Sequence, residues 1–175
     1  MECYRVLLAD DAGSGYRGIH RLEPVPEESA SDEFLSLFYR SCEYCEHSVY
    51  PGTTTELSIH ELRRFAELSS QITKKEYEIV CINEDPICSY PAKFYGIDVA
   101  GEGGYSMLAE GLFLPNSPLT KILNQFFLPK LNQFGLFDAL EDATLLKDLL
   151  FQLNQLHPGF VDRENWKTYY IYKIL

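Results

Sequence analysis

The stretch that decides the fold is WKTYYIYKIL, residues 166–175. Aromatic and β-branched side chains dominate this stretch, which predicts a β-strand. The aromatic residues alternate onto both sides of such a strand, so neither side suits open solvent. We therefore expect this strand either to lie in the centre of a sheet or to pair across a dimer.

Other apolar runs predict the strands that this one can join. Short apolar segments at 3–8, 77–82 and 94–99 each lead into charged or glycine-containing sequence, as strands commonly do. Residues 105–113 provide room for one more short strand. We therefore expect at least four strands.

Helical periodicity fills the intervals between these strands. Ser58 and Glu61 form a capping box at the start of one helix, and a leucine stripe between residues 138 and 156 marks the longest helix. Strands near both ends with helices between them predict an α+β fold. We expect a single domain, residues 1–175, with a mixed or antiparallel sheet and helices packed mainly on one face.

The negative charge lies in the first part of the chain. Residues 1–110 carry 20 acidic and 9 basic side chains, and residues 111–175 carry 6 of each, so the first part accounts for the whole net charge of −11. An acidic field repels nucleic acids and anionic membranes and attracts basic proteins. We therefore expect a basic protein partner, and neither nucleic acid nor a membrane.

The cysteines and the apolar segments indicate the compartment. Five cysteines leave at least one thiol unpaired, and the first residues lack the basic and apolar regions of a signal peptide. The most apolar stretch, residues 111–131, contains Pro115, Pro118 and Pro129, which argue against a clean membrane-spanning helix. We expect a cytoplasmic protein with free thiols and no cofactor.

Cys42, Cys45 and His47 resemble half of a metal site. Zinc needs about four such ligands, and Cys81 and Cys88 lie far from these residues in the sequence. Cys42 and Cys45 also continue the apolar side of the preceding helix, so we interpret them as buried thiols and expect no metal. A small enzyme that uses Cys45 with His47, or Cys88, is the alternative interpretation.

The segment 76–110 combines acidic and aromatic residues. It contains seven acids and one base, with tyrosine and phenylalanine side chains between them. Aromatic rings supply rigid contact area in protein interfaces, and carboxylates attract and pair with arginine. A solvated acidic face is the alternative interpretation. The expected partner contacts are Glu84, Asp85, Asp98, Glu102 and Tyr105.

Four short motifs resemble those of small bacterial immunity proteins from polymorphic-toxin systems. They are Gly96-Ile97-Asp98-Val99, Gly103-Gly104-Tyr105-Ser106, Phe134-Gly135-Leu136-Phe137 and Ile171-Tyr172-Lys173-Ile174. Proteins of this type are commonly cytoplasmic, acidic α+β domains that bind and block one cognate toxin. The resemblance covers about the second half of the chain and implies a toxin-binding role, with no catalytic residues.

These observations lead to one functional prediction and two alternatives. We expect a non-enzymatic, acidic binding protein, most simply an immunity-type inhibitor that neutralises a basic toxin or another basic protein. One alternative is the small cytoplasmic enzyme with a Cys/His site. The other is an oligomeric scaffold protein, for which a homodimer is one form.

Overall fold

Four strands form one antiparallel sheet in the computed structural model, which describes residues 2–8, 30–42, 56–101, 118–156 and 165–175. The sheet order is β1-β2-β4-β3, and the predicted α+β class with an antiparallel sheet is confirmed. The short strand considered at 105–113 lies outside the described residues. The strands are β1 (Cys3–Leu8), β2 (Tyr77–Asn83), β3 (Ala92–Gly101) and β4 (Trp166–Ile174). The helices are α1 (Asp32–Cys42), α2 (Ile59–Thr73), α3 (Pro118–Phe127), the short 3-10 helix η4 (Leu128–Lys130) and α4 (Leu140–Leu156).

Strand β4 occupies the centre of the sheet, between β2 and β3. Ile171 pairs with Ile82 on one side and with Gly96 on the other. Side chains of β4 enter two different buried clusters, because Tyr169 belongs to one and Tyr172 packs against the other. Of the two placements expected for this strand, the structure has the central one, and the fold uses aromatic residues from both of its faces.

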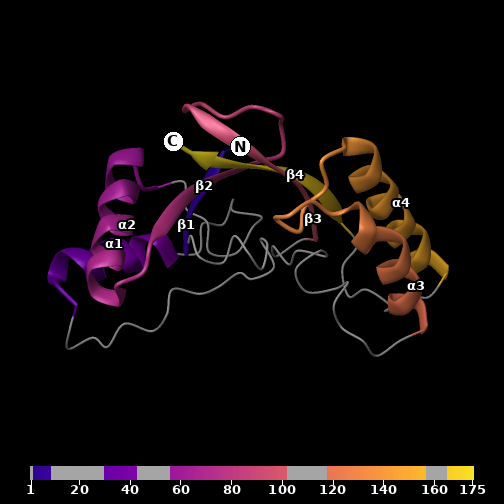
Figure 1. Cartoon of the computed structure of the whole chain (residues 1–175), viewed down its shortest axis with the longest axis horizontal. Helices are drawn as coiled ribbons and strands as arrows, with labels where there is room; N and C mark the ends of the chain where they lie inside the picture. The colour runs from indigo at the N-terminus through magenta and orange to yellow at the C-terminus, as the bar shows by residue number, and fades with distance from the viewer. Residues whose placement is uncertain (1, 9–29, 43–55, 102–117, 157–164) are drawn as a thin grey trace.

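The helices form two pairs, and each pair packs on its own hydrophobic cluster. Helices α1 and α2 lie beside β1 and β2, whereas α3 and α4 lie at the other end of the sheet, beside β3 and β4 (Figure 1). Ile79 and Cys81 of β2 enter the α1–α2 cluster, and Val80 and Ile82 enter the α3–α4 cluster. Neighbouring residues of a strand point to opposite faces, so the clusters use both faces of β2. This arrangement differs from the single layer of helices expected from the sequence, because both faces of the central strands are apolar and need cover.

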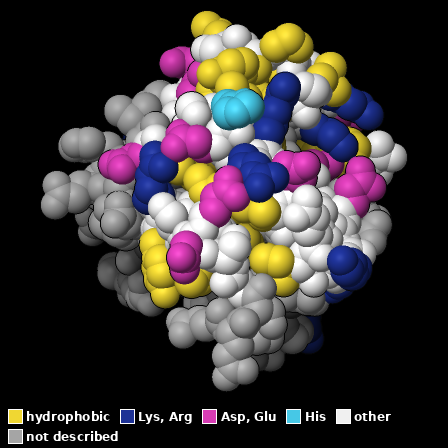
Figure 2. Space-filling model, turned by 90° about the vertical axis from the view of Figure 1, so that its left-hand side faces the viewer, with side chains coloured by type: hydrophobic (Ala, Val, Ile, Leu, Met, Phe, Trp, Pro, Cys, Tyr) yellow, Lys and Arg dark blue, Asp and Glu magenta, His cyan; other side chains and the backbone are white. Residues whose placement is uncertain are grey.

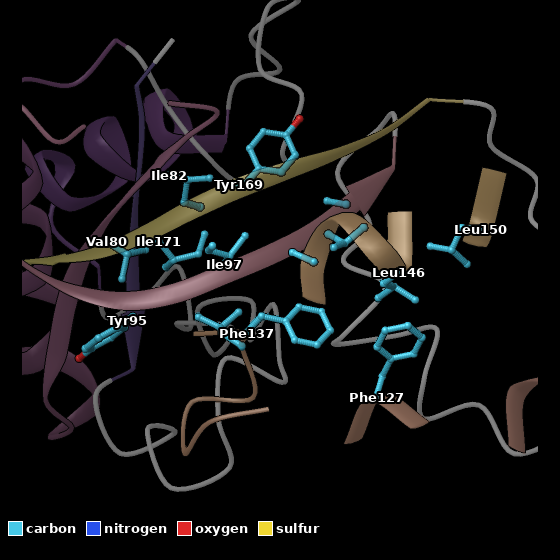
Figure 3. Packing of buried hydrophobic residues seen from close by; sticks show 14 of the residues in the cluster. Val80, Ile82, Tyr95, Ile97, Phe127, Phe137, Leu146, Leu150, Tyr169 and Ile171 are labelled. Atoms are coloured by element: carbon cyan, nitrogen blue, oxygen red, sulfur yellow. The ribbon is translucent and has the colours of Figure 1, made fainter. Parts of the chain in front are cut away.

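The α3–α4 cluster joins the sheet to two helices (Figure 3). Ile97 and Ile171 of the sheet share it with Phe127 of α3 and with Leu146 and Leu150 of α4. All five side chains are buried. Burial of one such side chain contributes about 1.5–3 kcal/mol, so this cluster is a main source of stability.

A β-bulge in β3 lets the loop before α4 approach the sheet closely. The register shifts between Phe94 and Gly96, and Gly96 has a φ of 146°, a conformation that favours glycine. A Cβ atom on Gly96 would stand 2.6 Å from Leu136 Cβ and 2.9 Å from the carbonyl oxygen of Phe137. Beside it, Ile97 and Phe137 exchange backbone hydrogen bonds of 2.8 and 3.0 Å. The loop is therefore fixed to the edge of β3 at a position that only glycine fits.

The start of α2 has the predicted capping box, which also ties α2 to α1. Glu61 Oε2 accepts hydrogen bonds from Ser58 N at 2.8 Å and from Ser58 Oγ at 2.7 Å, while Glu61 N donates to Ser58 Oγ. Arg40 of α1 donates to Glu61 Oε1 at 2.7 Å. The Ser58 hydroxyl, Arg40 and the Ser58 backbone N–H together hold the pKa of Glu61 at about 2.

The surface over α1 and α2 carries both signs of charge (Figure 2). These helices contain four acidic and three basic residues. Arg64 pairs with both Glu33 and Glu67 at 2.9 Å. The acidic excess is larger in β2, β3 and the segment between them, because residues 77–101 contain four acids and one base.

Candidate binding surface

The β2–β3 loop, residues 84–91, joins two strands that are not neighbours. Because β4 lies between β2 and β3, the loop has to cross the end of β4. At this crossing the N–H of Leu175 donates to the carbonyl oxygen of Pro91 at 3.0 Å. Figure 1 shows the loop arching over the sheet beside the end marked C. The topology therefore carries the loop across the end of β4, and this hydrogen bond fastens its far end.

Further hydrogen bonds brace the loop from below. Asn83, which is buried at the end of β2, accepts a hydrogen bond from Asp85 N at 3.3 Å and donates its side-chain amide to Ile87 O at 3.0 Å. Ser89 N donates to Glu2 Oε1 at 2.7 Å. A loop that is already ordered loses less conformational entropy when it binds a partner.

Large apolar side chains of this region reach solvent. Ile87 is 63% exposed, Tyr90 is 37% exposed, and Phe94 in β3 is 41% exposed. Tyr90 packs edge-on against Tyr4 with 5.9 Å between ring centroids, and Phe94 packs against Tyr172 at 5.3 Å. Exposed aromatic and aliphatic side chains on a rigid support are typical of protein interfaces.

Two acidic residues begin the loop, and both are exposed. Glu84 Oε1 accepts a hydrogen bond from Lys167 Nζ of β4 at 2.8 Å, and Asp85 follows directly. An ion pair between exposed side chains contributes only about 0–1 kcal/mol. Glu84 can therefore exchange Lys167 for a cationic group of a partner at little cost.

The structure places the five predicted contact residues in three different situations. Glu84 and Asp85 lie together at the exposed start of the β2–β3 loop, as a contact surface requires. Asp98 is fully buried in β3, where its Oδ1 accepts a backbone hydrogen bond of 2.7 Å, so it cannot contact a partner at the surface. The physical reason is that this part of β3 is buried on both of its faces. Glu102 and Tyr105 lie outside the described residues.

A cluster of possible metal ligands also lies beside the loop. A carboxylate oxygen of Glu2 and the Sγ atoms of Cys81 and Cys88 are all within 4.8 Å of one another. Burial raises the pKa of the Cys81 thiol, and the neighbouring Cys88 thiol raises it further. Burial disfavours the ionised form of Glu2, but hydrogen bonds from Ser89 and Tyr4 outweigh this effect and lower its pKa.

Sequence reasoning missed this cluster and the exposed Ile87. The spacing of Glu2, Cys81 and Cys88 follows no ligand motif, and only the tertiary structure brings them together. The side chains of Cys42, Cys45 and His47 are outside the described part of the structure. The buried-thiol interpretation of these residues and the enzyme alternative therefore stay predictions.

No protein-family model, curated protein or solved structure matches this chain. Among the helices of the described ranges, none has the length and apolar character needed to cross a bilayer.

Proposed function

We propose that this protein binds a basic protein partner through the β2–β3 loop and the aromatic residues beside it, without catalysing a reaction. The observation that carries the proposal is the combination of exposed Glu84 and Asp85 with exposed Ile87 on one braced loop. The resemblance to immunity proteins supports a toxin domain with a cationic cleft as the partner. A cytoplasmic location belongs to the same proposal.

The acidic and apolar groups of the loop have different kinetic roles. Long-range attraction between carboxylates and a basic surface raises the association rate. Burial of Ile87 and Tyr90 in the complex slows dissociation, since apolar anchors surrounded by a polar rim supply most of the binding free energy. This division makes the two halves of the proposal separately measurable.

The first experiment is affinity capture from a lysate of the source cells, with the tagged full chain as bait and mass spectrometry as readout. We expect one basic protein in near-stoichiometric amount at low ionic strength, and its loss at high ionic strength. Rate constants of the purified pair are then measured by surface plasmon resonance. The variant with Glu84→Arg and Asp85→Arg is expected to slow association about tenfold or more, and Ile87→Ser is expected to speed dissociation.

A matched control reverses two charges on another face. Glu141 and Asp148 are exposed on α4, and Glu141→Arg with Asp148→Arg changes the net charge by the same amount. If this control slows association as much as the loop variant does, the charge of the whole molecule guides the partner and the loop assignment is wrong. An association rate that is independent of ionic strength contradicts the electrostatic part of the proposal.

A further inference from the structure

Three segments of the chain bring potential metal ligands to one place. Glu2 precedes β1, Cys81 lies in β2, and Cys88 lies in the β2–β3 loop. Tyr4 of β1 pairs with Cys81 in the sheet register, which brings the N-terminal segment to this side of β2. The loop returns over the end of β4 and places Cys88 beside Cys81. The separation between any two of the three ligand atoms is at most 4.8 Å.

We propose that Glu2, Cys81 and Cys88 bind a zinc-type divalent metal ion. Two thiolates with a carboxylate form a donor set that suits zinc, which favours sulfur ligands in tetrahedral geometry. With Zn–S bonds of about 2.3 Å, a tetrahedral ion holds two sulfur atoms about 3.8 Å apart. Closure around the ion therefore requires movements of at most about 1 Å.

Neighbouring groups already orient the carboxylate ligand. Tyr4 Oη donates to one oxygen of Glu2 at 2.8 Å, and Ser89 N donates to the other at 2.7 Å. Each carboxylate oxygen keeps a second lone pair for a metal. Hydrogen bonds of this kind hold ligands in place at metal sites, and their loss typically weakens metal affinity about 10–100-fold.

The proposed ion would join three segments of the fold. Cys81 is fully buried, whereas Glu2 and Cys88 are half-buried, so solvent reaches the site from their side. Three protein ligands leave a fourth tetrahedral position for water. Binding converts two thiols to thiolates, so each ion bound releases two protons to the buffer. The metal proposal does not depend on the proposed partner, because metal binding is measured on the isolated chain.

Cobalt(II) is the probe for the first experiment, because its thiolate complexes absorb light. The full chain carries Cys3→Ala, Cys42→Ser and Cys45→Ser, which leaves Cys81 and Cys88 as its only thiols. A phosphine reductant keeps both thiols reduced, and circular dichroism verifies folding. We expect thiolate-to-cobalt charge-transfer bands with tetrahedral d–d bands, saturation at one ion per chain, and displacement by Zn²⁺.

Single substitutions in this background assign the ligands. Cys88→Ser is expected to abolish the charge-transfer pattern of a two-thiolate site, and Glu2→Gln to weaken affinity about tenfold or more. Tyr4→Phe is expected to weaken affinity about 10–100-fold while the spectrum is retained. Glu76→Gln, an exposed acid outside the cluster, is the matched control and should leave affinity unchanged.

Thermal unfolding provides a second readout that does not depend on cobalt. At a free Zn²⁺ concentration about a hundredfold above Kd, the Tm is expected to rise by about 5–10 °C. The rise should disappear in Cys88→Ser. Absence of thiolate charge-transfer bands in the two-cysteine chain overturns the proposal, as does a cobalt or zinc affinity that Cys88→Ser and Glu2→Gln leave unchanged.

Discussion

Replacement of Gly96 by alanine tests whether the bulge in β3 controls the packing of the second half of the chain. Gly96 has a φ of 146°, and an added Cβ would meet Leu136 Cβ at 2.6 Å and the Phe137 carbonyl oxygen at 2.9 Å. Neither neighbour can move easily. Leu136 is fully buried, and Phe137 is held by its two backbone hydrogen bonds to Ile97.

The expected loss of stability has two sources. A non-glycine residue at this φ costs about 1–3 kcal/mol in backbone strain. The extra methyl group in a closed contact costs about another 1–3 kcal/mol, because the loop before α4 has to shift away from β3. We therefore expect Gly96→Ala to lower the free energy of unfolding by about 2–6 kcal/mol, which is a large share of the stability of an average domain.

Urea unfolding followed by tryptophan fluorescence measures this loss. The chain has one tryptophan, Trp166, and it packs against the α3–α4 cluster that Leu136 joins. The control is Gly135→Ala, where φ is 71° and the left-handed conformation alone costs about 1–2 kcal/mol. If Gly96→Ala destabilises the protein no more than Gly135→Ala, the close approach at the bulge is not a structural constraint and the reasoning fails.

The remaining predictions concern the helices. Leu146→Ala in the α3–α4 cluster is expected to cost about 2–5 kcal/mol, whereas Leu145→Ala, at a half-exposed neighbouring position, should stay within about 0.5 kcal/mol; equal losses in urea unfolding would contradict the burial. Glu61 has its pKa lowered from 4.5 to about 2, so its stabilising effect is complete above pH 4.5 and is lost as pH falls towards 2. Glu61→Gln should therefore reduce the fall of Tm between pH 4.5 and about 2. An unchanged fall would contradict the stabilising role of the ionised Glu61. Arg64→Ala removes two exposed ion pairs and should cost less than about 1 kcal/mol, with a larger loss arguing for a cooperative network.

Local chemistry was sufficient to predict the elements and one feature of the topology. The two-sided aromatic pattern of residues 166–175 predicted a strand that is either central or paired across a dimer, because a strand with two apolar faces needs cover on both. The sheet order shows the central placement. The capping box of Ser58 and Glu61 was predictable for a similar reason, since both partners lie within one helical turn. Such signals depend on residues that are close in the sequence.

Contacts between distant segments gave no comparable signal. Asp98 carries a charge and looks like a surface residue, yet the cover on both faces of β3 buries it completely. A buried charged group requires polar partners, which the tertiary structure supplies. The local sequence around Asp98 does not indicate these partners. The meeting of Glu2, Cys81 and Cys88 depends in the same way on which strands are neighbours, and strand order is a global property of the chain.

The strand order also explains why both candidate sites lie at the β2–β3 loop. Neighbouring strands can be joined by a two-residue turn, but β4 separates β2 from β3, so the eight residues 84–91 have to cross it. A crossing loop cannot join the ladder of the sheet, and its polar backbone groups need other partners. Asn83, Glu2 and Leu175 supply hydrogen bonds to it. Ile87 is exposed on the loop that these bonds hold, and Cys88 of the same loop lies beside Cys81. The restraint that satisfies the loop backbone therefore also fixes the residues on which both proposals rest.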